Sequence, residues 1–182
     1  MGDRVKGKVA IVTGAGSVSR GIGNGRAAAI LYAREGARVM LVDYNLEAAE
    51  ETKYLIDGEM GDSFTFRADV VKSDDCDRIV NQCISVYGRV DILHNNVGIE
   101  IPGGIEDISE NDWDKTINVN LKSVFLTCRH VLPHMVKQGG GSIVNISSIN
   151  GIRTLPAFSG PYGASKAGMI ALTREIAMEY AS

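Results

Sequence analysis

The sequence of 182 residues contains little cysteine, little proline and few aromatic residues. The three cysteines, Cys76, Cys83 and Cys128, are odd in number and form no C-x-x-C pair, so neither a disulfide framework nor a zinc cluster is expected. No stretch rich in proline, glycine and serine divides the chain as a linker would. We therefore predict one domain over residues 1–182.

The chain also lacks an excess of positive charge and any long apolar run. A formal net charge of -3 excludes the strongly basic surface of a general nucleic-acid binder. The apolar run that ends at Thr13 is too short for a signal peptide, and no stretch approaches the length of a membrane span. We expect a cytoplasmic protein that binds neither nucleic acid nor membrane.

What is present is an alternation of strand and helix patterns. Nearly continuous apolar runs, typical of strands buried on both faces of a parallel sheet, occur at 9–13, 38–42, 63–68, 90–95 and 142–147. Helical spacing of apolar residues is found at 73–87, at 109–136, where Pro133 should end or kink the helix, and at 161–181. This alternation predicts an α/β fold with a doubly wound parallel sheet and right-handed crossovers.

A glycine-rich segment, "TGAGSVSRGIGNGRAAAI", follows the first predicted strand. Such a turn between a buried strand and a helix exposes backbone N–H groups at a helix N-terminus, where a diphosphate binds. The alternative is that the glycines only form turns. Arg20 lies in the same loop and could meet a phosphate. The context of strand, loop and helix favours dinucleotide binding.

Asp43 ends the second predicted strand. A carboxylate at this place can accept both hydroxyl groups of the adenosine ribose and repels a 2′-phosphate, which favours NAD over NADP. The alternative is that Asp43 is the N-cap of the following helix. NAD is therefore the expected cofactor, with NADP left open.

Six motifs follow one another along the chain: "TGAGS…GNGRA", "DV" at 69–70, "NNVG" at 95–98, "NVNL" at 118–121, "NISS" at 145–148 and "YGASK" at 162–166. In this order they resemble the short-chain dehydrogenase/reductase family, and the resemblance covers the whole chain. It implies a Rossmann-like sheet with helices on both faces, which holds NAD(H) or NADP(H). It also implies reversible hydride transfer between the nicotinamide and an alcohol or carbonyl substrate.

The resemblance also implies four catalytic residues. Tyr162 would be the general acid/base for the substrate oxygen, and Lys166 would hold the nicotinamide ribose and favour the ionised phenol. Ser148 would hydrogen-bond the substrate oxygen, and Asn120 would anchor a water for proton relay. Residues implied to bind the cofactor are Gly14, Gly23, Gly25, Asp43, Asp69, Val70, Asn95, Gly98, Tyr162 and Lys166.

The spacing of Tyr162 and Lys166 agrees with that role. Residues four apart share one face of a helix, so the ammonium can lie near the phenol. Because tyrosine ordinarily ionises near pH ~10, a base at neutral pH needs such a cation. The alternative makes the two residues an exposed surface pair and Ser148 a strand-end cap.

The sequence departs from the family pattern in two places. The glycine loop is lengthened, so Gly23 and Gly25 compete with Gly21 and Gly23 as its last two fingerprint glycines. The family also continues beyond the last predicted helix with a strand and a substrate loop, so we expect the chain to be C-terminally incomplete relative to it.

Together these patterns predict an NAD(P)-dependent oxidoreductase that acts on a small secondary alcohol or ketone. The resemblance implies a homo-oligomer, either a dimer or a tetramer. The alternative is a nucleotide-binding or interaction protein without catalysis. No metal is expected, because His130 and His134 lack an H-E-x-x-H glutamate and Pro133 lies between them.

Overall fold

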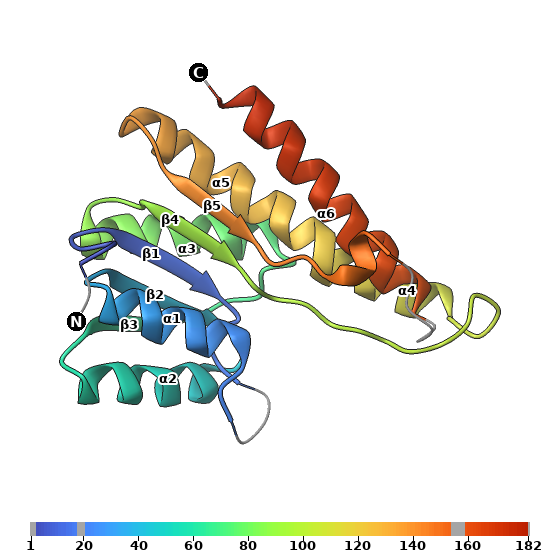
Figure 1. The fold of residues 1–182 in the computed structure, drawn as a ribbon, viewed down its shortest axis with the longest axis horizontal. Helices are drawn as coiled ribbons and strands as arrows, with labels where there is room; N and C mark the ends of the chain where they lie inside the picture. Colours follow the sequence, from blue (N-terminus) through green and yellow to red (C-terminus); the bar gives the residue numbers. More distant parts are fainter. Residues whose placement is uncertain (1–2, 18–20, 154–158, 182) are drawn as a thin grey trace. The chain divides into compact units, whose positions relative to one another are not determined.

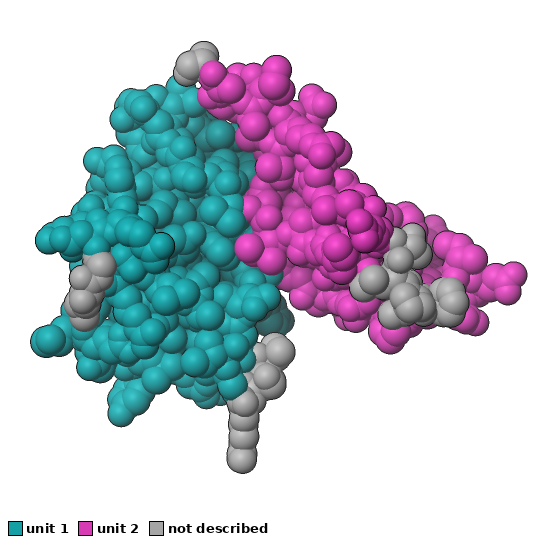
Figure 2. Space-filling model, viewed as in Figure 1, with its two compact units in different colours: residues 1–96, 126–144 teal, residues 97–125, 145–182 magenta. Residues whose placement is uncertain are grey.

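Strands and helices alternate through the residues that the computed structural model describes, which are 3–17, 21–153 and 159–181 (Figure 1). These residues form two units, coloured separately in Figure 2. The first comprises residues 1–96 and 126–144, and the second 97–125 and 145–182. The single domain that the sequence suggests stays a prediction, and each unit is described by itself.

A sheet with the strand order β3-β2-β1-β4-β5 forms the centre of the first unit. Its strands are β1 (Val9–Thr13), β2 (Arg38–Asp43), β3 (Asp62–Arg67), β4 (Ile92–Asn95) and β5 (Ser142–Asn145), the last of which ends in the second unit. β1 pairs in parallel with β2 and β4, and β2 pairs in parallel with β3. The predicted doubly wound parallel sheet is confirmed.

The helices of the first unit follow from this strand order. They are α1 (Asn24–Arg34), α2 (Leu46–Gly58), α3 (Ser73–Tyr87) and most of α5 (Ser123–Lys137). Right-handed crossovers that step one way from β1 to β3 put α1 and α2 on one face, and the return step to β4 puts α3 on the other (Figure 1). The predicted helix at 73–87 is confirmed to the residue.

Burial of the strands matches the prediction in the centre of the sheet and not at its edge. Every residue of β1 is buried, as are the four central residues of β2. β3 stands last in the strand order, and its residues are only partly buried or exposed. The alternation of Ser63, Phe64, Thr65 and Phe66 suits a strand with one better-covered face.

Several predicted boundaries need correction; β5, for example, ends at Asn145, two residues earlier than expected. β4 begins at Ile92, two residues later than expected, although Asp91 still contacts β1: its N–H donates to Val9 O at 2.9 Å, and its Oδ2 accepts the N–H of Val9 at 2.9 Å. Pro133 does not end α5, which continues to Lys137. A proline removes only one N–H from the helical pattern, and the last turn closes through Gln138 N–H, which donates to His134 O at 3.0 Å.

The second unit contains α4 (Glu110–Ile117), a π-helical turn η1 (Asn118–Lys122), a 3-10 turn η2 (Ile149–Gly151) and α6 (Gly160–Glu179). Ser109 caps α4 by accepting the N–H of Asp112 at 3.1 Å. The single predicted helix at 109–136 is interrupted by η1, because its backbone there shifts to the wider π pattern. α6 packs against α4, η1 and η2.

The described helices include none whose length and apolar character would let it cross a membrane.

Candidate functional site

The glycine loop leaves the C-terminal end of β1 at the point where the strand order reverses. The chain goes from β1 to β2 on one side, while β4 pairs with β1 on the other. In open parallel sheets, ligands bind at this switch point, outside the carboxyl ends of the strands. The first unit therefore has the loop and the place for a dinucleotide.

Gly25 and Gly16 are positions in the loop where a side chain does not fit, and a Cβ on Gly16 would lie 2.6 Å from Ala48 Cβ. A Cβ on Gly25 would lie 1.9 Å from Gly14 O, and Gly14 itself has φ of +65°. Gly21 has open space around it, and Gly23 is the N-cap of α1. Since the last fingerprint glycine is needed for close approach of helix and strand, this geometry favours Gly23 and Gly25 over Gly21 and Gly23.

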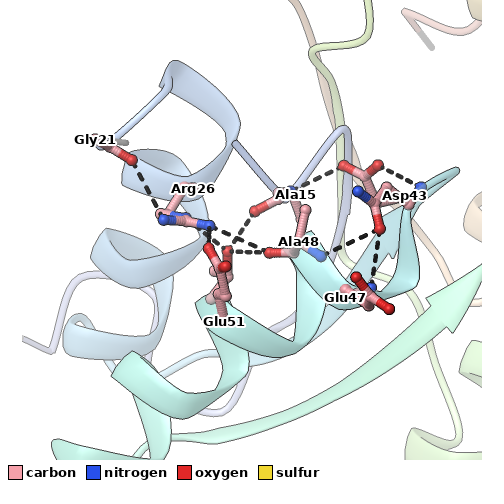
Figure 3. Close-up of polar contacts among 10 residues, drawn as sticks. Ala15, Gly21, Arg26, Asp43, Glu47, Ala48 and Glu51 are labelled. Carbon is pink, nitrogen blue, oxygen red and sulfur yellow. Dashed lines mark hydrogen bonds and ion pairs between the residues drawn. The ribbon is translucent and has the colours of Figure 1, made fainter. Parts of the chain in front are cut away.

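Asp43 lies at the end of β2, next to the start of the loop (Figure 3). Its Oδ2 accepts the N–H of Gly16 at 2.9 Å, and its Oδ1 accepts the N–H of Asn45 at 2.9 Å. The N-cap of α2 is Asn45, whose Oδ1 accepts from Glu47 at 3.1 Å. The alternative role of Asp43 as the cap of this helix is therefore wrong. Each carboxylate oxygen keeps a lone pair for a further donor.

The other predicted residues of the first unit have structural partners. Asp69 Oδ1 accepts the N–H of Val71 at 3.3 Å, and Val70 is buried. Asn95 is buried as well, and its Oδ1 accepts from Thr127 Oγ1 at 2.9 Å, so its side chain reaches α5. Arg20 lies outside the described residues.

Asn96, which the sequence analysis did not single out, makes the contact with the glycine loop. Its Nδ2 donates to Gly14 O at 3.1 Å, and its N–H lies 3.3 Å from Thr13 Oγ1. The "NNVG" motif contains two adjacent asparagines, Asn95 and Asn96, and the motif alone does not tell which of them contacts the loop. Only the alternation of side chains at the end of β4 separates them.

Tyr162 and Lys166 occupy the first turns of α6 in the second unit. Lys166 Nζ lies 5.6 Å from the centre of the Tyr162 ring and donates to Ile146 O at 2.8 Å. The lysine is 3% exposed, and this burial lowers the pKa of its ammonium. The alternative of an exposed surface pair is therefore wrong for Lys166.

Gly98 and Asn120 lie beside the same ammonium. A Cβ on Gly98 would be 3.2 Å from Lys166 Nζ and 3.5 Å from Asn120 Oδ1. Asn120 is fully buried; its Oδ1 accepts from Ile99 N at 2.8 Å, and its Nδ2 donates to Ile99 O and Ser165 Oγ at 2.9 and 3.0 Å. Because both amide hydrogens are used, this side chain can offer a water only its remaining Oδ1 lone pair.

Ser148 is the N-cap of η2, where its Oγ accepts the N–H of Asn150 at 3.2 Å. It thus caps the turn that follows β5. A hydroxyl that accepts in this way keeps its own proton for another partner. Capping and a hydrogen bond to a substrate oxygen are therefore compatible.

His130, one of the two histidines considered above for a metal, contacts side chains of α3. His130 lies 3.0 Å from Ser73 Oγ through Nε2 and 3.5 Å from Asp77 Oδ1 through Nδ1. Over the described ranges, no group of three His, Cys, Asp or Glu side chains is arranged to hold a metal ion.

Comparison with known proteins identifies the family. The family model described as "short chain dehydrogenase" matches residues 8–182. The 3-oxoacyl-[acyl-carrier-protein] reductase FabG of Thermotoga maritima is 40% identical over 178 residues, which cover 98% of this chain and 70% of that protein. The D-threitol dehydrogenase of Mycolicibacterium smegmatis is 37% identical over 177 residues, which cover 97% of this chain and 66% of that protein.

A solved structure agrees with these relatives. The crystal structure of a short-chain dehydrogenase/reductase from Burkholderia xenovorans matches with a TM-score of 0.97 and 46% identity, covering 98% of this chain and 71% of the other. The chain thus spans about two thirds of the length of its relatives. Motifs, fold and comparisons agree that the chain belongs to the short-chain dehydrogenase family of oxidoreductases, with a Rossmann-like α/β fold.

Proposed function

We propose that this chain binds NAD in preference to NADP and serves a dehydrogenase/reductase that interconverts a small secondary alcohol and its ketone. The observation that carries the proposal is the buried ammonium of Lys166 beside the Tyr162 ring. Burial of an ammonium is costly, and here Ile146 O accepts a hydrogen bond from it. Such a group is typical of a functional site rather than of a surface pair.

The first unit has the features that a dinucleotide needs. Because Gly25 has no side chain, the start of α1 lies close to Gly14 at the end of β1. The backbone N–H groups at this helix N-terminus can then bind a diphosphate. Asp43 retains acceptor capacity for the hydroxyl groups of the adenosine ribose, and Asp69 and Val70 would lie beside the adenine. We assign Gly14, Gly23, Gly25, Asn95 and Gly98 to the same cofactor.

Asp43 also supports the choice of NAD. Its carboxylate is held in place by two backbone N–H groups, those of Gly16 and Asn45. A fixed negative charge at this place attracts the ribose hydroxyls and repels a 2′-phosphate. Asp43→Ser is expected to raise the Kd for NADH and to lower the ratio of the Kd for NADPH to the Kd for NADH.

The proposed chemistry needs one mobile proton. The nicotinamide, when bound, supplies or accepts the hydride. Tyr162 Oη would donate the proton to the carbonyl oxygen of the ketone, or remove it from the alcohol, as a general acid/base. Lys166 Nζ would stabilise the phenolate by its charge and would hold the nicotinamide ribose. Ser148 Oγ–H would hydrogen-bond the substrate oxygen, and Asn120 would hold a water that returns the proton to solvent.

The experiment is to follow NADH absorbance in the full chain with a panel of secondary alcohols and ketones. The panel includes a sugar alcohol and a 3-oxoacyl thioester, the classes named for the two relatives above. Tyr162→Phe removes only the phenolic oxygen, so turnover should fall by about 10²-fold or more while NADH binding persists. Tyr180→Phe, at the C-cap of the same helix, is the matched control.

The outcomes separate the two candidate functions. Loss of turnover in Tyr162→Phe alone supports the assignment of the acid/base, and full turnover in that variant contradicts it. A parent chain that binds NADH and turns over no member of the panel supports the non-catalytic alternative. We also propose a homo-oligomer, dimer or tetramer, which light scattering on the purified chain tests.

A further inference from the structure

Arg26 is a buried arginine directly after the fingerprint glycines, and its side chain points to the glycine loop and α2 (Figure 3). It is 6% exposed. Its Nε donates to Thr52 Oγ1 at 3.1 Å and its Nη1 to Gly21 O at 3.2 Å. Its Nη2 donates to Ala48 O at 3.3 Å and to Glu51 Oε2 at 2.7 Å. Four of the five guanidinium N–H groups are thus used within the protein.

Thr52 carries the effect of Arg26 to the other end of the loop. Its hydroxyl has a single proton and two carbonyl oxygens within reach, Ala15 O at 2.7 Å and Ala48 O at 3.3 Å. Arg26 already donates to Ala48 O and also to the Thr52 oxygen itself. The threonine proton is therefore directed to Ala15 O, the nearer acceptor.

These contacts matter because a phosphate-binding loop must present N–H groups outward. Its carbonyl oxygens then point into the protein, where each needs a donor. Arg26 supplies that donor directly for Gly21 and through Thr52 for Ala15. Gly16 N–H, in contrast, is held by Asp43.

We propose that Arg26 is a positioning residue for the cofactor diphosphate, acting through the carbonyl groups of the glycine loop at Ala15 and Gly21. The inference rests on the dinucleotide binding proposed above. Arg26 is not proposed to contact the phosphates itself, because its guanidinium is buried and most of its N–H groups donate to α2 and to Gly21 O. Lysine cannot replace it, since an ammonium on a flexible stem lacks the planar fork that reaches Thr52 and Gly21 together.

The test measures the Kd of the full chain for NADH by fluorescence and for ADP-ribose by displacement, alongside the melting temperature. Arg26→Lys and Thr52→Val should each raise both Kd values about tenfold, as expected when buried loop carbonyls lose their donors. Thr52→Ser keeps the hydroxyl and should stay within about twofold of the parent. In the double variant Arg26→Lys/Thr52→Val, the fold-increase in Kd should be less than the product of the two single fold-increases, because both residues act on Ala15 O.

Arg34→Lys is the matched control on the same helix. Arg34 also reaches the end of α2, where its Nε and Nη2 each lie 2.6 Å from a Glu59 oxygen, but it is exposed and stands at the opposite end of α1 from the loop. It should change the melting temperature at most, and leave Kd unchanged. A positioning role shifts Kd in folded protein, whereas a merely structural role shifts only the melting temperature.

Unchanged Kd values in folded Arg26→Lys and Thr52→Val overturn the inference while the proposed function stands. Equal losses in Thr52→Val and Thr52→Ser also overturn it, because they point to packing and not to the hydroxyl. If Arg26→Lys does not fold, the pair at Thr52 decides alone. A parent chain that binds no NADH overturns the proposed function, and the inference with it.

Discussion

Replacing Gly25 by alanine tests the assignment of the glycine loop most directly. The added Cβ would lie 1.9 Å from Gly14 O and 2.5 Å from Asn96 Nδ2, so α1 or the loop must move by roughly 1 Å to reach a tolerable contact. Overpacking of this kind costs about 3 kcal/mol, and the better helix propensity of alanine offsets about 1 kcal/mol of it. The expected loss of stability is therefore about 2 kcal/mol, or a fall in Tm of roughly 4–8 °C.

Gly21→Ala is the control, because a Cβ there has no neighbour within 4 Å. It should leave the free energy of unfolding within about 0.5 kcal/mol of the parent. Urea unfolding and NADH fluorescence titration measure both variants. Gly25→Ala should raise the Kd for NADH at least about tenfold, since the shift displaces the loop where the diphosphate binds. The assignment of Gly23 and Gly25 as fingerprint glycines is refuted if Gly25→Ala has the free energy of unfolding and the Kd for NADH of the parent. It is also refuted if Gly21→Ala loses more stability or affinity than Gly25→Ala.

Two further predictions concern buried titratable groups. Burial lowers the pKa of His94 from 6.5, so between that lowered pKa and pH 6.5 the unfolded chain binds a proton that the folded chain does not. The free energy of unfolding should fall as the pH drops below about 6.5. Urea titrations at several pH values should show a smaller fall for His94→Gln, and an equal dependence on pH in both proteins contradicts this. Burial raises the pKa of Cys76 and Cys83 to about 12 and that of Cys128 to about 11. Ellman's reagent at pH 8 should therefore label three thiols in urea and none in native protein, and rapid native labelling would contradict the burial.

The sequence predicts most of the fold because local and global signals coincide. Helix α3 has paired acidic residues at its start, Gly88 in the left-handed conformation at its end and a buried apolar face, so its bounds are predicted without error. Strand β1 is predicted to the residue and β2 to within one residue, because their apolar runs are long enough to be buried on both faces. The helix does not end at Pro133, whereas a kink there stays a prediction, and η1 interrupts a helix that the sequence predicts to be continuous.

The candidate site is less predictable, because its key hydrogen bonds join polar side chains to backbone groups that are far away in the sequence. Asn45, and not Asp43, caps α2, although both residue types favour that position. Arg26 and Asn96 have no periodicity or composition that marks them, and their partners lie 26 and 82 residues away along the chain. Only the folded structure brings a guanidinium and an amide to the loop carbonyls.

The lengthened glycine loop can be reconciled with the family fold by these same contacts. The carbonyl oxygens of Gly14, Ala15 and Gly21 each accept from a donor outside the loop. The donors are Asn96, which directly follows β4, Thr52 of α2 and Arg26 of α1, respectively. Both ends of the loop are therefore fixed by side chains on rigid elements, and not by the length of the segment between them. Because extra residues in a loop with fixed ends add little closure entropy, the insertion can be accommodated while Gly25 keeps its close approach to β1. The position of the diphosphate site is then set by the donors around the loop, which is why Arg26 and Thr52 are the residues where the proposed binding should be most sensitive.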